Sequence, residues 1–182
     1  MPYTSIDFNN STVLITGGAG FIGSNLALYF QEKFPLSLIV IFDCFQSGET
    51  LDNGNLVSFG HYKNLISFTG DIICGNINKK EDLEQLNEYS FDYIFHHAAI
   101  SDTRVYDQEL MMRTNVNSFY DILTIAKKDN AKIVYASSAA VYGSLPSPQS
   151  VGIESPENPY GFSKLSMDQI AQNFQIKNPD IQ

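Results

Sequence analysis

Short apolar runs alternate with amphipathic stretches along most of the chain. The apolar runs predict five β-strands, at 12–16, 38–43, 64–70, 91–99 and 132–138. The patterns between them predict helices at 21–34, 79–89 and 106–129, and from Pro159 onward. Several strands are apolar at consecutive positions, which is typical of strands covered on both faces. The alternation therefore predicts an α/β fold with a Rossmann-type, doubly wound parallel sheet.

Two segments rich in Gly, Asn, Ser and Pro, 44–63 and 142–159, predict loops. The second resembles a long loop beside a site more than a domain linker, because helical patterning resumes after it. The 182 residues match one ordinary domain, and 43% hydrophobic residues suffice for a core. We expect one domain over 11–182, preceded by a short extension at 1–10.

Composition narrows the range of partners. The formal net charge is -9, with 20 acidic and 11 basic residues and no basic run, so nucleic acid is not an expected partner. The sequence has neither an apolar run of membrane-spanning length nor a signal peptide, which predicts a cytoplasmic protein without membrane contact. Cys44 and Cys74 fit neither a disulfide framework nor a zinc spacing, so we expect free thiols and no metal site.

The segment TGGAGFIG, residues 16–23, joins the first predicted strand to the first predicted helix. It contains two overlapping glycine spacings, Gly18-x-Gly20-x-x-Gly23 and Gly17-x-x-Gly20-x-x-Gly23. Such glycines let the backbone turn sharply and approach a pyrophosphate, which binds at the positive end of the helix that begins near Phe21. The segment predicts a dinucleotide site. A glycine turn that only packs the helix on the strand is the weaker alternative.

Asp43 ends the second predicted strand, 20 residues after Gly23. Its carboxylate can accept hydrogen bonds from a ribose 2′-hydroxyl. The same charge repels a 2′-phosphate, and 44–50 contains no Lys or Arg, so these residues favour NAD over NADP. The next predicted strand ends in Gly70-Asp71-Ile72, which directs Asp71 toward the adenine; a solvated carboxylate is an equal alternative there.

Tyr160 and Lys164 are four residues apart on the last predicted helix and therefore share one face. A cation beside a tyrosine favours the phenolate, so Tyr160 could remove an alcohol proton while hydride leaves the same carbon. Ser138 lies at the end of the fifth predicted strand, where parallel sheets open their ligand crevice, and could bind the same oxygen. A Tyr-x-x-x-Lys pair alone is common, and its agreement with the glycine turn makes it informative.

These motifs together resemble the extended short-chain dehydrogenase/reductase family. They occur in the family's order, at 16–23, Asp43, 70–72, His97-Ala98-Ala99, Asn115, Ser137-Ser138 and Tyr160-x-x-x-Lys164. Within the family, the segments 96–119, 135–143 and 154–168 most resemble the ADP-glyceromanno-heptose 6-epimerases, which act on the heptose of the lipopolysaccharide inner core.

The resemblance implies that a tightly bound nicotinamide cofactor removes hydride from C6 of the heptose and returns it to the other face. It implies Tyr160 as base, with Lys164 and Ser138 as its catalytic partners, and Ser101 and Ser138 on the substrate side. The implied cofactor contacts are Gly17, Gly20, Phe21, Ile22, Gly23, Asp43, Cys44, Asp71, Ile72, His97, Ala98, Ala99, Asn115 and Lys164. The subfamily implies NADP, against the charge of Asp43, so NADP and NAD both stay open.

Several alternatives remain. A UDP-sugar 4-epimerase and a non-catalytic dinucleotide-binding module are the rivals, whereas Ala139-Ala140 after Ser138 argues against a 4,6-dehydratase. His96 and His97 are adjacent on a strand and so point to opposite faces, which disfavours one metal ion. The family continues well past the tyrosine helix, so we expect this chain to lack most of the small C-terminal substrate domain. The resemblance also implies a homo-oligomer for the full-length protein.

Overall fold

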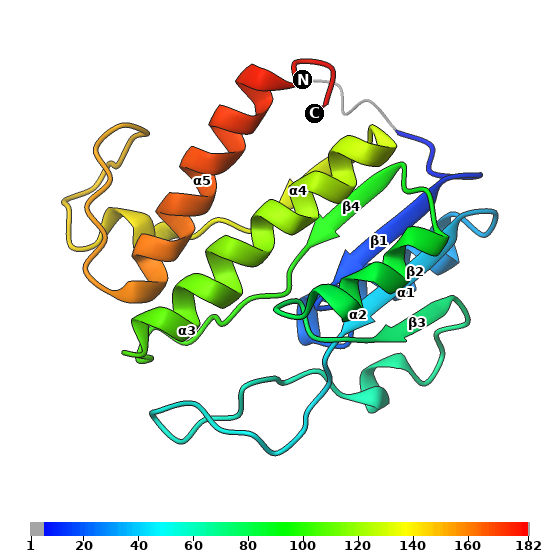
Figure 1. Cartoon of the computed structure of the whole chain (residues 1–182), viewed down its shortest axis with the longest axis horizontal. Coiled ribbons are helices and arrows are strands. Elements are labelled where there is room, and N and C mark those ends of the chain that lie inside the picture. The colour runs from blue at the N-terminus through cyan, green and yellow to red at the C-terminus, as the bar shows by residue number, and fades with distance from the viewer. Residues whose placement is uncertain (1–5, 182) are drawn as a thin grey trace.

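A five-stranded parallel sheet forms the centre of the molecule. The computed structural model describes residues 6–181. Its strands lie in the order β3-β2-β1-β4-β5, and every pair is parallel. Their bounds are β1 Thr12–Thr16, β2 Leu38–Asp43, β3 Asp71–Cys74, β4 Tyr93–His96 and β5 Lys132–Tyr135. This order confirms the predicted Rossmann-type sheet (Figure 1).

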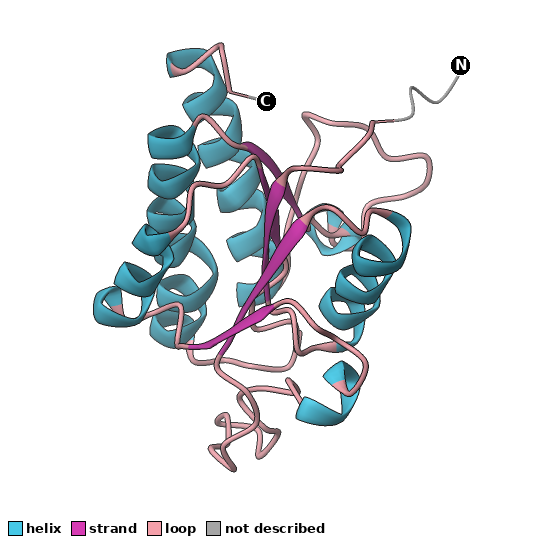
Figure 2. Cartoon of the chain, turned by 90° about the vertical axis from the view of Figure 1, so that its right-hand side faces the viewer, coloured by secondary structure: helices cyan, strands magenta, loops and turns pink. Residues whose placement is uncertain are grey.

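Helices cover both faces of the sheet (Figure 2). The α-helices are α1 Phe21–Lys33, α2 Lys80–Glu84, α3 Gln108–Met112, α4 Ser118–Asp129 and α5 Pro159–Lys177. Shorter 3₁₀ turns are η1 Tyr62–Leu65, η2 Gln85–Glu88 and η4 Ala139–Tyr142, and η3 Arg113–Asn117 is a π-helical turn. No helix within residues 6–181 has the length and apolarity needed to cross a membrane.

Alternate residues of the central strands enter two different cores. Val13, Ile15 and Ile41 pack against α1 on one face. Leu14, Val40 and Phe42 pack on the other face. Their neighbours there come from α2, η2 and α4 and are Leu83, Leu86, Ile122 and Ala126. Burial of both faces explains why these strands are apolar throughout. A further cluster fixes α5 on α4 and β5, through Phe119, Leu123 and Met167.

One predicted strand is wrong. Residues 64–70 contain the end of η1 and the turn after it, and β3 begins only at Asp71. Leu65 and Phe68 are buried beside α1, which accounts for the apolar pattern without a strand. Asp71 pairs with Val40 in the sheet, so it starts β3 and does not end it.

The other predicted elements are correct apart from their ends. The strands predicted at 91–99 and 132–138 end earlier, because the last pair between them joins His96 and Tyr135. The helix predicted at 106–129 begins at Gln108 and contains the π-helical turn η3. That turn inserts one additional residue and redirects the side chains that follow it.

Candidate active site

The carboxyl ends of the five strands meet at one edge of the sheet. β2 and β3 follow one another on one side of β1, and β4 and β5 lie on its other side. In open parallel sheets this change of direction, here between β1 and β4, opens the crevice where ligands bind. Thr16, Asp43, His96 and Tyr135 end strands at this edge.

The glycine turn joins β1 to α1 and lies at this crevice. Gly17 has φ +67°, and a Cβ atom there would lie 2.7 Å from the backbone nitrogen of Ala98. A Cβ atom on Gly23 would lie 2.3 Å from the carbonyl oxygen of Gly17. Only glycine therefore fits at either position. The first contact also places His97 and Ala98 beside the turn. The contact of 97–99 with a cofactor stays a prediction.

The start of α1 offers donors to an anion. Gly20 is the N-cap and provides no side-chain cap, and the first turn has no acidic residue. The first backbone N–H groups of a helix have no partner within it, and the helix dipole adds positive charge there. Phe21 and Ile22 are 83% and 61% exposed, so this end is open to solvent. The turn and helix start fit a pyrophosphate group.

Asp43 is buried behind the turn at 5% exposure. Its two oxygens accept hydrogen bonds from the backbone N–H groups of Ala19, at 2.9 Å, and Phe45, at 2.8 Å. Burial raises the pKa of this carboxyl, and the two backbone donors oppose that rise. Asp43 thus shapes the glycine turn from behind, and its contact with a ribose stays a prediction. Cys44, directly after it, is exposed.

Asp71 and Ile72 lie away from the carboxyl edge, because they begin β3. Asp71 accepts a hydrogen bond from the Tyr89 hydroxyl at 3.0 Å. The expected position of Asp71 at a strand end is therefore wrong. Gly75 occupies that place and donates from its N–H to the Asp43 carbonyl at 2.9 Å. Asn76 follows Gly75 and donates from its N–H to the Asp82 carboxylate at 2.7 Å.

α5 presents Tyr160 and Lys164 on one face. Asn158 caps the helix by accepting a hydrogen bond from the Gly161 N–H at 2.8 Å, and Pro159 occupies the first turn. Both features are strong helix-start signals. The Lys164 Nζ atom lies 5.9 Å from the centroid of the Tyr160 ring. The two residues that are four apart in the sequence thus lie side by side on the helix.

The Lys164 ammonium is buried, with 3% of the residue exposed. Among residues 6–181 its hydrogen-bond partner is the sulfur of Met167, 3.7 Å away. Burial lowers the pKa of Lys164 to about 8, although the charge of Asp168 opposes this. A buried ammonium needs oxygen acceptors, and ribose hydroxyls would supply them. The site therefore fits a nicotinamide dinucleotide.

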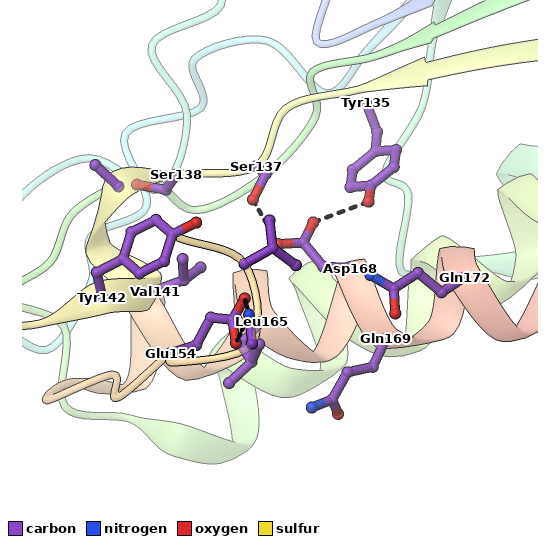
Figure 3. Close-up of a pocket in the computed structure, with 13 residues that line it drawn as sticks. Tyr135, Ser137, Ser138, Val141, Tyr142, Glu154, Leu165, Asp168, Gln169 and Gln172 are labelled. Atoms are coloured by element: carbon purple, nitrogen blue, oxygen red, sulfur yellow. Dashed lines mark hydrogen bonds between the residues drawn. The ribbon is translucent and has the colours of Figure 1, made fainter. Parts of the chain in front are cut away.

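Ser138 lies beside the start of α5. Its hydroxyl accepts a hydrogen bond from the Ala140 N–H at 3.2 Å and caps η4. A Cβ atom on Gly161 would lie 2.5 Å from the Ala140 carbonyl oxygen, so η4 packs directly on the helix that carries Tyr160. Ser138 also lines a cavity of about 750 Å³ between β5 and α5 (Figure 3).

A buried network supports this site from behind. Asn115 is fully buried; its Oδ1 accepts from the Ile100 N–H at 2.8 Å, and its Nδ2 donates to the Ser163 hydroxyl at 3.0 Å. Ser163 in turn donates to the Tyr160 carbonyl at 2.7 Å. Asn115 therefore joins the loop after β4 to α5. Ser163 belongs to this network although no sequence motif marks it.

His96 ends β4, and Ser101 and Arg104 lie in the loop after this strand. Ser101 is exposed on the loop after β4. On the same loop, Arg104 pairs with Asp102 through Nε at 3.1 Å and Nη2 at 3.2 Å. His96 is buried, with Nδ1 2.8 Å from the Thr16 hydroxyl. Burial, followed by the charge of Lys164, lowers the pKa of His96 to about 3 and also lowers the pKa of His97.

Comparison with known proteins agrees with this geometry. Residues 13–181 match the model of the NAD dependent epimerase/dehydratase family. The chain belongs to this family. The membership confirms the resemblance found in the sequence, and homologues in this family have been crystallised with NAD.

Several solved structures of epimerases and dehydratases are similar to this chain. The chain is similar to ADP-L-glycero-D-manno-heptose-6-epimerase of Helicobacter pylori, with 49% identity, a TM-score of 0.85, and coverage of 95% of this chain and 54% of that one. It is also similar to a Bacillus anthracis dTDP-glucose 4,6-dehydratase in complex with NAD, with 30% identity, a TM-score of 0.72 and coverage of 92% and 51%. For a Brucella ovis UDP-glucose 4-epimerase in complex with NAD the values are 27%, 0.73, 91% and 48%. The chain thus spans about half the length of these relatives.

Proposed function

We propose that this chain forms the cofactor-binding and catalytic part of a nucleotide-sugar epimerase. The proposed reaction inverts C6 of ADP-D-glycero-D-manno-heptose to the L-glycero form. The observation that carries the proposal is the 49% identity with the Helicobacter pylori enzyme over 95% of this chain. The paired Tyr160 and Lys164, beside a glycine turn that fits a dinucleotide, support it.

The chain's own residues would move the proton and hold the reacting groups. The Tyr160 phenolate oxygen takes the proton from the C6 hydroxyl, becoming a hydroxyl, and later returns that proton to the same oxygen of the sugar. Lys164 favours the ionised tyrosine and binds the ribose hydroxyls, while the Ser138 hydroxyl donates to the reacting oxygen. A nicotinamide ring, when bound, supplies the site that accepts and returns hydride.

Both NAD and NADP are compatible with the residues around the end of β2. The buried Asp43 carboxylate disfavours a 2′-phosphate. Against this, η1 packs on the glycine turn, since the His61 N–H and the Asn64 amide both donate to the Ala19 carbonyl, at 3.0 and 2.8 Å. The exposed Lys63 of η1 therefore brings a cation to this neighbourhood that the sequence pattern did not reveal.

The test is to supply ADP-D-glycero-D-manno-heptose with NAD or NADP and to separate the C6 epimers of the product. It uses this chain and, where the reading frame continues past Gln182, the longer chain. Tyr160→Phe should bind the cofactor normally and lose about 10²- to 10⁴-fold in turnover, because only the proton-transferring hydroxyl is removed. Tyr142→Phe, which changes another tyrosine beside Ser138, is the matched control.

The outcomes separate the alternatives. Equal turnover of Tyr160→Phe and the wild type would remove Tyr160 as the base. Epimerisation of a UDP-hexose at C4, without action on the heptose, would favour the UDP-sugar 4-epimerase. Cofactor binding without exchange of hydride with either sugar would favour the non-catalytic module.

A further inference from the structure

The Asp168 carboxylate joins α5 to the end of β5. Its Oδ1 accepts a hydrogen bond from the Tyr135 hydroxyl at 2.8 Å, and its Oδ2 accepts one from the Ser137 hydroxyl at 2.7 Å. Figure 3 shows both hydroxyls pointing toward the carboxylate from the strand side of the cavity. Hydrogen bonds to a carboxylate are about twice as strong as neutral ones. One side chain thus connects two residues that are more than thirty positions away in the chain.

The hydrogen bonds to Asp168 lie at the point where the strand pairing of β5 ends. β5 is the outermost strand, so it has a strand neighbour on one side only within residues 6–181. Its pairing with β4 ends at Tyr135, opposite His96. Ser137 and Ser138 lie beyond that last pair. Beyond Tyr135 the segment is therefore held by side-chain hydrogen bonds and no longer by backbone hydrogen bonds to β4.

The same carboxylate lies close to the catalytic face of α5. Asp168 follows Lys164 by four residues, so the two side chains lie on one face of the helix. The negative charge of Asp168 raises the pKa of Lys164 and so opposes the effect of burial. Asp168 thus acts on the charge of Lys164 and binds Ser137, the neighbour of Ser138, without itself being one of the predicted catalytic residues.

We propose that Asp168 is a positioning residue, which fixes the Ser138 hydroxyl relative to Tyr160 by holding the end of β5 on α5 and which supports the charge of Lys164. The inference rests on the proposed function, because that function assigns the roles of Ser138 and Lys164. Its test uses neither cofactor nor sugar. Failure of the inference and failure of the proposed function therefore give different results.

The first readout is amide hydrogen exchange at Ala140, measured by NMR. The Ala140 N–H donates to the Ser138 hydroxyl, so its protection reports where that hydroxyl lies. Asp168→Ala should accelerate this exchange about tenfold, as should the double variant Tyr135→Phe with Ser137→Ala. Gln172→Ala changes a side chain of the same cavity without affecting the connection, and it should leave the exchange unchanged.

The second readout is the pKa of Lys164, followed through its side-chain NMR signals. Asp168→Asn should lower this pKa further below about 8, because the favourable charge is lost. The double variant retains the charge and should leave the pKa in place. General loosening of α5 would instead return the lysine toward its ordinary value.

Two results would overturn the proposal. One is unchanged Ala140 exchange in both the Asp168→Ala protein and the double variant. The other is a Lys164 pKa in Asp168→Asn that stays constant or rises. If Asp168→Ala fails to fold, the double variant and Asp168→Asn still decide each part.

Discussion

At the scale of single residues, the most informative group is the buried Lys164 ammonium. Burial of an ionised side chain without oxygen partners costs free energy, and a protein retains such a group where a ligand or a reaction needs it. Lys164 is 3% exposed, and its neighbour at 3.7 Å is a thioether sulfur. Lys164 therefore destabilises the ligand-free chain, and hydroxyl groups of a bound ligand would supply the oxygen partners that the ammonium lacks.

This cost predicts how stability depends on pH. The pKa of Lys164 is about 8 in the folded chain and 10.5 in the unfolded chain. Below pH 8 Lys164 is charged in both the folded and the unfolded chain, and only the folded chain pays the free-energy cost of burying that charge. As the pH rises from 8 to 10.5 only the folded state loses the proton, so the contribution of Lys164 to the unfolding free energy rises. The change is of the order of 3 kcal/mol.

The variant Lys164→Met should be more stable than the wild type at pH 7, and its advantage should shrink as the pH approaches 10.5. Urea titrations across this range measure the difference. Lys177→Met is the control, because Lys177 is exposed on the same helix. A constant difference between Lys164→Met and the wild type from pH 7 to 10.5 would contradict the burial of a charged lysine.

At the scale of elements, the sequence predicted α1 and α5 well because their start signals are local. Gly20 and the apolar run after it mark the first helix, and Asn158 with Pro159 marks the last. β3 was misplaced because its apolar signal has a different origin: Leu65 and Phe68 fill the core beside α1 from a 3₁₀ turn and its exit. Burial alone does not distinguish a strand from a packed turn.

The 3₁₀ turn η1 leads to a prediction about the choice of cofactor. Because η1 packs on the glycine turn, Lys63 is the cation expected to meet a 2′-phosphate. Lys63→Ala should weaken NADP binding about tenfold and NAD binding by less than about threefold, in calorimetric titrations. Lys33→Ala, at the far end of α1, is the matched control. Equal losses for both dinucleotides would mean that Lys63 does not face the 2′ position.

At the scale of the whole molecule, the sequence predicted which residues converge but not what holds them. Strand alternation and the family motifs were enough to bring the glycine turn, Ser138 and Tyr160 to one edge of the sheet. The supporting contacts of Asn115 and Asp168 join segments 15 to 48 residues apart. Such pairings depend on the packed fold, and no local spacing encodes them.

The central claim is that a nicotinamide dinucleotide binds on the glycine turn, and calorimetric titration of NAD and NADP into this chain and its Gly20→Ala variant tests it most directly. Gly20 has φ -74°, and an added Cβ atom would meet only the Gly17 carbonyl oxygen, at 3.2 Å, so the variant should fold. The methyl group would occupy space that a pyrophosphate needs. We expect the wild type to bind a dinucleotide and Gly20→Ala to bind it at least about tenfold more weakly, with similar unfolding free energies. Equal affinity of the two proteins, or no binding by a folded wild type, would contradict the claim.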